Sequence, residues 1–230
     1  MRSREKFLIL KSLVALALIC ICLIAAQWQY HRGVDRHARN SMIEANIAAP
    51  NISLALAVSD PTKNEWRTVN TTGAFIVDQT ILLRNRYFEG KYGFEFLTLF
   101  ETSSGQKLWV DRGWLVAGKD ALTAPVIPST PTGEVEISGR LRLDSSLPRG
   151  SFFALPASGT GLISKWNAQK EVVTEGFYLD LLNGSVSELT PNVSAQLPEL
   201  SDGPHMAYAL QWVFFAGLVG YGRILIRRAR

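Results

Sequence analysis

The stretch EVEISGRLRL, residues 134–143, decides what kind of fold the middle of this chain adopts. Its apolar residues alternate with polar or charged ones, and they are Val135, Ile137, Leu141 and Leu143. A period of two residues is typical of a β-strand with one buried face, because successive side chains of a strand point to opposite sides. The pattern therefore predicts a half-buried strand.

Similar but less regular runs lie on both sides of this strand, at residues 66–78, 81–86, 93–101, 106–115 and 176–182. Most of them are not separated by an amphipathic helix of a dozen residues, so neighbouring strands are expected to pair antiparallel. The triplet SSG at 103–105 is expected to form a hairpin turn, and the proline-containing stretch 117–133 a long loop. We therefore expect a mainly antiparallel β-domain, either a small barrel or a sandwich.

Two apolar runs flank this predicted domain. Residues 7–26 are about long enough to span the hydrocarbon core of a bilayer, and a second run of seventeen uncharged residues precedes Arg223. Residues 32–47 contain no proline and are expected to continue the first helix outward. The fold class that follows is a membrane protein with transmembrane helices at 7–28 and 205–226. These helices flank an extracytoplasmic β-rich domain over residues 29–204.

Charge is unevenly distributed along the chain and predicts its orientation. Residues 40–203 contain 13 Lys or Arg and 18 Asp or Glu, whereas the flanks contain 11 and 2. Nucleic-acid binding is disfavoured, because it needs positive charge on the folded domain. The basic ends at residues 1–6 and 227–230 predict that both termini are cytoplasmic. The N-terminus lacks the composition of a transit peptide, which favours a bacterial inner membrane over a mitochondrial one. A cleaved signal peptide ending near residues 25–26 is the alternative to a first transmembrane helix.

The strand-forming part of this domain, residues 66–182, contains no histidine or cysteine, which limits its chemistry. Nucleophilic systems that use histidine, and histidine-rich metal sites, are therefore not available within it. Cys20 and Cys22 lie inside the first apolar run, two residues apart and so on different faces of a helix, and we interpret them as lipid-facing packing. These residues predict that the protein is not an enzyme.

The stretch DGPHMAYALQW, residues 202–212, places a histidine at the start of the second apolar run. Asp202 or Gly203 can cap the helix, with proline at its first position. His205, Tyr208 and Trp212 then share one helix face by their spacing. Two interpretations stay open: an interfacial belt that anchors the helix, or an axial ligand for a macrocycle between aromatic side chains.

The stretch LWVDRGWL, residues 108–115, also has two interpretations. Gly113 permits a tight turn at a strand end and Arg112 can pair with a nearby acid, which would be purely structural roles. Alternatively, Arg112, Gly113 and Trp114 face solvent at the end of a strand and form a docking edge for another protein.

Five motifs in order along nearly the whole chain resemble the surfeit locus family of cytochrome c oxidase assembly proteins. They are WQxxR (Trp28, Gln29, Arg32), EWRxVxxxGxF (65–75), the block from GxxGFEFLTLF to LWVDRGW (90–114), VxxSGRLR (135–142) and HxxYALQW (205–212). Each motif is weak alone, but their order and spacing make the resemblance specific. Asp111 departs from the asparagine that the family often has there, and Ala207 from a common glycine.

The resemblance implies a non-enzymatic, chaperone-like assembly factor of the respiratory chain that assists delivery or insertion of heme a into the catalytic subunit. It implies His205 as ligand of the heme iron. From their positions in the sequence, we expect Tyr208 and Trp212 beside it and His31, across the same interface, as a second candidate ligand. Its partners would be cytochrome c oxidase subunits and heme a biosynthesis proteins, and its partner-binding motifs Trp28, Gln29, Arg32, Arg112, Gly113 and Trp114. The alternative is an exported, membrane-anchored scaffold for another membrane complex, without a cofactor.

Overall fold

The computed structural model describes residues 2–119, 123–143 and 161–229, and the chain forms two compact units. The first, the helical unit, consists of Met1–Met42 and Glu199–Arg230. The second, the β-unit, consists of Ile43–Pro198. Residues 120–122 of the predicted loop, and residues 1 and 230 of the predicted cytoplasmic ends, lie outside the described residues.

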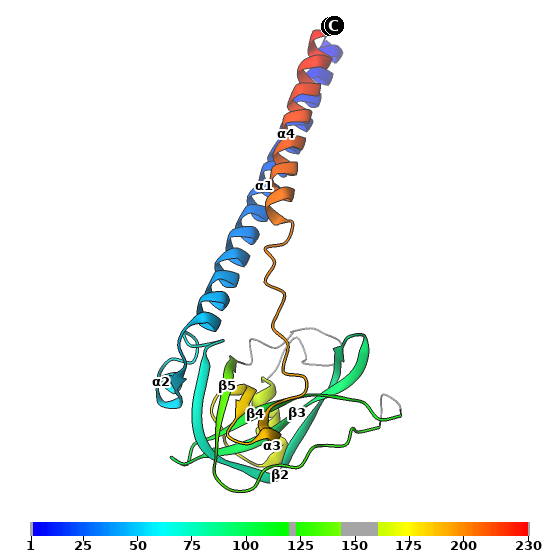
Figure 1. Cartoon of the computed structure of the whole chain (residues 1–230). Helices are drawn as coiled ribbons and strands as arrows, with labels where there is room; N and C mark the ends of the chain where they lie inside the picture. The colour runs from blue at the N-terminus through cyan, green and yellow to red at the C-terminus, as the bar shows by residue number, and fades with distance from the viewer. Residues whose placement is uncertain (1, 120–122, 144–160, 230) are drawn as a thin grey trace. The chain divides into compact units, whose positions relative to one another are not determined.

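The helical unit contains α1 (Arg2–Ala48) as far as Met42 and all of α4 (His205–Arg228), and the two ribbons run beside one another in Figure 1. Both helices are long and apolar enough to cross a membrane by length and composition. The predicted continuation of the first helix is confirmed: α1 runs unbroken to Ala48, shortly before Pro50, which disfavours helical geometry in the residue that precedes it. Residues 29–48, assigned above to the β-rich segment, are therefore helical.

Small residues are the least exposed residues of both apolar runs: Cys22 and Ala26 on α1, and Ala216 on α4. The interpretation of Cys22 as lipid-facing is therefore wrong, whereas Cys20 is exposed. Small residues at such positions let two helices approach closely. The remaining apolar residues of both runs are largely exposed, as expected for surfaces that face lipid.

The β-unit contains one six-stranded sheet in the order β1-β2-β3-β4-β6-β5, and an additional pairing of β2 with β5 closes it into a barrel-like form (Figure 1). The strands are β1 (Ile52–Ser53), β2 (Thr68–Phe88), β3 (Lys91–Thr102), β4 (Lys107–Val116), β5 (Val135–Leu143) and β6 (Phe177–Gly184). Most pairs are antiparallel, as predicted, but β1 with β2 and β4 with β6 are parallel. The long connection between β4 and β6 allows this, because it includes β5 and a helix.

Strand β2 differs from the prediction, because the runs 66–78 and 81–86 belong to one strand of 21 residues. Its register against β3 shifts between Phe75 and Thr80, where Asp78 has a φ of 67°. An irregularity of this kind bends a strand, which a closed sheet requires. In the sequence, the polar residues 78–80 separate the two runs at this irregularity.

The turns agree with the sequence. The predicted SSG turn connects β3 to β4, with a φ of 83° at Gly105. Glu89 and Gly90 connect β2 to β3, and both have positive φ, as a two-residue hairpin of type I′ needs. The described residues of the stretch 117–133 contain no helix or strand.

Two hydrophobic clusters lie on the two faces of the sheet. The inner cluster contains the alternating residues of β5, with Val135, Ile137 and Leu141 buried and Leu143 packed against them, so the predicted core face is confirmed. The outer cluster forms where α3 (Leu162–Lys170) packs on residues of β3, β4 and β6, including Trp109. The short elements α2 (Leu54–Ser59) and η2 (Ser187–Leu189) complete the unit and have no counterpart in the sequence prediction.

Candidate functional site

The structure brings together two of the sequence motifs within the helical unit. His205 is the first residue of α4, and its Nδ1 lies 2.9 Å from Oε1 of Gln29 on α1. An amide oxygen only accepts hydrogen bonds, so Nδ1 donates and carries the imidazole proton. In the neutral imidazole, Nε2 then carries the lone pair. The WQxxR and HxxYALQW motifs therefore meet through one hydrogen bond that fixes a histidine tautomer.

Gly33 allows the first turn of α4 to lie close to α1. A Cβ atom at this position would be 2.9 Å from Sδ of Met206 and 3.4 Å from Cβ of His205. Gly33 is one helical turn from Gln29, so it lies on the same face of α1. The close approach places the imidazole within reach of the Gln29 amide.

Polar contacts hold the segment that leads into α4. The predicted cap was wrong: the helix is capped at Pro204 without a side-chain hydrogen bond, and the side chain of Asp202 contacts α1 instead. Its carboxylate lies 2.8 Å from Nδ1 of His37 and accepts a hydrogen bond of 3.1 Å from Asn40. The hydrogen bond from His37 lowers the pKa of Asp202. Arg36 donates to the carbonyl oxygen of Ser201 over 2.5 Å.

The other predicted residues of the helical unit lie around this contact. Trp28 is 57% exposed and lies under the guanidinium of Arg32, 5.8 Å from its ring centroid. Trp212 is half-buried with its ring edge-to-face against Phe215, whereas Tyr208 is 46% exposed and does not share the buried face. His31 is exposed with its ring against Tyr30, and it lies two residues from both Gln29 and Gly33, away from their face of α1. The structure does not bring His31 to His205.

The Arg112-Gly113-Trp114 motif of β4 is mostly buried, so the expected solvent-facing edge is not what the structure shows. Arg112 is 3% exposed; it donates to the carbonyl oxygen of Ser129 and lies over two phenylalanine rings, those of Phe75 and Phe96. Gly113 has a φ of 109°, and a Cβ there would lie 2.5 Å from the carbonyl oxygen of Val193. These contacts serve the fold; a role in partner binding stays a prediction and would fall mainly to the half-buried Trp114.

A buried cluster of charged side chains on the outer face of the sheet was missed by the sequence reasoning. Asp180 on β6 pairs with Arg142 on β5 over 2.5 Å, and the guanidinium lies 3.9 Å from the ring centroid of Trp66. Asp111 lies directly opposite Asp180 in the parallel register of β4 and β6. Charges at alternating strand positions look solvent-exposed in the sequence, and here they are not.

The carboxyl group of Asp111 is the most strongly perturbed acid of this cluster. Burial raises the pKa of Asp111 well above its ordinary value, and the charges of Glu95 and Asp180 raise it further. Its Oδ1 accepts a hydrogen bond of 2.8 Å from the backbone N–H of Gly113, which acts in the opposite direction. No group of three or more potential metal ligands among His, Cys, Asp and Glu occurs in the described part of the chain.

Together, these features define a class of protein: along the chain, two long apolar helices precede and follow a barrel-like β-unit, and a histidine is held where the second helix begins. The chain belongs to the SURF1 family, whose model matches residues 16–217. It is similar to uncharacterized SURF1-like proteins of Mycobacterium bovis and Mycobacterium tuberculosis. Each is 28% identical over 250 residues, a match that covers 98% of this chain and 89% of the relative.

Proposed function

We propose that this chain is a membrane-anchored assembly factor for cytochrome c oxidase that helps heme a reach the catalytic subunit. Membership of the SURF1 family, which is linked to assembly of this oxidase, supports the proposal. In it, α1 and α4 cross the bilayer, both termini are cytoplasmic, and the β-unit is extracytoplasmic, as the basic ends favour. Its role is binding and transfer, so turnover of a substrate is not expected.

The hydrogen bond between His205 and Gln29 is the observation that carries the heme part of the proposal. A histidine that ligates a metal almost always donates its other ring N–H to an acceptor, which fixes the tautomer and orients the ring. Gln29 does this at Nδ1, and Nε2 is then the nitrogen available to iron. Trp212 and Tyr208 would hold the macrocycle, which would supply an iron centre for His205 to ligate.

The proposed partners are subunits of the oxidase and proteins of heme a biosynthesis. Trp28 and Arg32 form an exposed pair on α1, and aromatic and arginine side chains are the most frequent anchors of protein interfaces. Both side chains are exposed, whereas that of Gln29 is half-buried where it contacts His205. A partner could therefore contact this pair while His205 stays bonded to Gln29.

The heme proposal is tested with the purified full-length chain from cells that make heme a. We expect a Soret band in the wild type and in His37→Ala, and its loss in His205→Ala. His37 is the matched control, because it also joins α1 to the segment before α4 but has its Nδ1 bonded to Asp202. Equal spectra for both variants would exclude His205 as the ligand.

The assembly proposal is tested separately, by deletion of the gene. We expect less assembled oxidase and less heme a in its catalytic subunit, restored by the wild-type gene. Normal oxidase in the deletion strain would contradict the proposal. Cross-links from Trp28 or Arg32 to an unrelated complex, together with no heme in the purified chain, would favour a scaffold module without a cofactor.

A further inference from the structure

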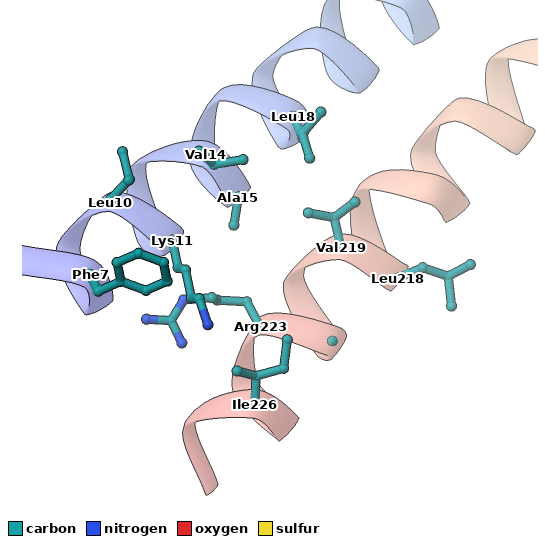
Figure 2. Close-up of a pocket in the computed structure, with 11 residues that line it drawn as sticks. Phe7, Leu10, Lys11, Val14, Ala15, Leu18, Leu218, Val219, Arg223 and Ile226 are labelled. Carbon is teal, nitrogen blue, oxygen red and sulfur yellow. The ribbon is translucent and has the colours of Figure 1, made fainter. Parts of the chain in front are cut away.

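A groove between α1 and α4 lies far along both helices from His205, and the proposed heme site does not use it. It has a volume of about 510 Å³ and walls that are almost entirely apolar. Phe7, Leu10 and Leu18 contribute from α1, and Leu218 and Ile226 from α4 (Figure 2). Helix pairs normally close such a space with side chains, so an open groove of this size calls for an occupant.

Two cations lie at one end of this groove, one from each helix. Figure 2 shows Lys11 and Arg223 converging between the helices, close to Phe7. The ammonium of Lys11 lies 5.1 Å from the centroid of the Phe7 ring. No acidic residue lines the groove among the residues that the structure describes. The end of an apolar groove thus carries two positive charges that these lining residues do not neutralise.

Two of the three guanidinium nitrogen atoms of Arg223 make hydrogen bonds, and the third makes none among the described residues. Its Nη2 donates to Oγ of Ser12 over 2.7 Å and to the carbonyl oxygen of Leu8 over 3.2 Å, and Nε also donates to Ser12. Its Nη1 is buried and has no hydrogen-bond partner among the described residues. A buried donor without an acceptor is unfavourable, and more so when it is charged. One donor of Arg223 therefore lacks an acceptor among the described residues.

We propose that this groove binds an anionic phospholipid, with the phosphate between Lys11 and Arg223 and an acyl chain along the apolar walls. The inference rests on the membrane insertion that the proposed function includes. From Phe7 to Leu18 the groove extends about 16 Å along the helix, at 1.5 Å per residue. That length is about half of the hydrocarbon core of roughly 30 Å, so the groove has the depth of one leaflet.

The positive charges of Lys11 and Arg223 favour anionic over zwitterionic lipids. A phosphate group would pair with the ammonium of Lys11 and the guanidinium of Arg223, both of which line the groove. A zwitterionic lipid would bring its own positive group close to the same two cations, which lowers its affinity. Basic pockets between transmembrane helices are known sites for anionic headgroups. Free phosphate would leave the apolar walls empty.

The experiment uses the full-length chain, purified in a non-ionic detergent and mixed with equal amounts of dioleoyl phosphatidylglycerol and dioleoyl phosphatidylcholine. Bound lipid is counted by native mass spectrometry. We expect the anionic lipid to be retained in preference, and Lys11→Gln or Arg223→Gln to lower its affinity about fivefold each. Arg228→Gln, which removes the same charge from the same helix outside the groove, should have no effect.

A second pair of variants tests the groove itself without changing any charge. Gly222 lines the groove, and a Cβ added there meets no atom within 4 Å, so Gly222→Leu fills the space without a clash. It should reduce retention of both lipids. Gly217 is equally open but does not line the groove, so Gly217→Leu is the matched control and should bind as the wild type does. Arg223→Lys, which keeps the charge, should retain most of the preference.

Equal retention of the two lipids by the wild type, or unchanged retention in both Arg223→Gln and Gly222→Leu, would overturn the inference. So would competition by inorganic phosphate at the concentration of the lipid. The readout needs neither heme nor oxidase. A chain that supports oxidase assembly but shows no lipid preference refutes the lipid site alone, and a chain with the preference but no role in assembly refutes the proposed function alone.

Discussion

Replacing Gln29 by leucine tests whether this residue sets the state of the His205 imidazole. Leucine has a similar volume but no acceptor, so Gln29→Leu removes the 2.9 Å hydrogen bond with little change in packing. A half-buried hydrogen bond of this kind contributes about 1 kcal/mol net, equivalent to about fivefold in an equilibrium. We therefore expect the ratio of the two neutral tautomers of His205 to shift about fivefold away from the form protonated at Nδ1.

The tautomer ratio is measured by nitrogen NMR on the full-length chain with labelled histidine, in detergent and without heme. Heme affinity, followed by the Soret band, should fall about tenfold or more, the usual effect of losing the group that orients a metal ligand. Gln27→Leu is the matched control, because Gln27 is exposed two residues away on α1. It should leave both measurements unchanged.

The reasoning fails if Gln29→Leu leaves the tautomer ratio as it is in the wild type. It also fails if the tautomer ratio shifts as expected but heme affinity stays at the wild-type value. In our interpretation Gln29 acts only through His205, so the two measurements should change together.

Three further predictions concern stability. Asp111→Asn should raise the free energy of unfolding at pH 7, because the raised pKa of Asp111 means that the ionised carboxylate destabilises the folded state as pH rises through the folded-state pKa. Below the ordinary carboxyl pKa the group is protonated in both states, so the difference between variant and wild type should vanish there. Urea unfolding at both pH values measures this. Gly113→Ala should lower the free energy of unfolding by about 2–4 kcal/mol, because of its φ of 109° and the clash with Val193, as seen by thermal melting. Asp202→Asn should speed hydrogen exchange at residues 201–205 near pH 7. The stabilisation by Asp202 is lost as pH falls through its lowered pKa, so wild type and variant should then exchange alike.

Local pattern was enough to predict the strands and their buried residues. The alternation in β5 identified Val135, Ile137 and Leu141 as core residues, and all three are buried. The same pattern placed Arg142 on the outer face but could not show that this face is covered. Burial of Arg142 beside Asp180 depends on pairing with β6, which lies more than thirty residues further along the chain. Long-range pairing of this kind leaves no periodic signal in the sequence.

In the candidate site, too, only the features that depend on neighbouring residues could be predicted from the sequence. A glycine and a proline before His205 predicted that a helix begins there, and the structure confirms the start of α4 at this residue. The partner of His205 could not be predicted, because Gln29 is 176 residues away and the contact depends on the register of α4 against α1. Gly33 sets that register through close approach, and a glycine within a helix gives no signal that distinguishes this role.

The contact between Trp114 and Val193 limits how another protein can add to the β-sheet. Strand β4 pairs with β6 only through Trp109–Asp111, which leaves the later residues of that edge free of β6. The backbone N–H of Trp114 donates over 2.9 Å to the carbonyl oxygen of Val193, so the chain's own connecting segment occupies this edge. An incoming strand from a partner protein would first have to displace the segment around Val193. Recognition through side chains and loops requires no such displacement.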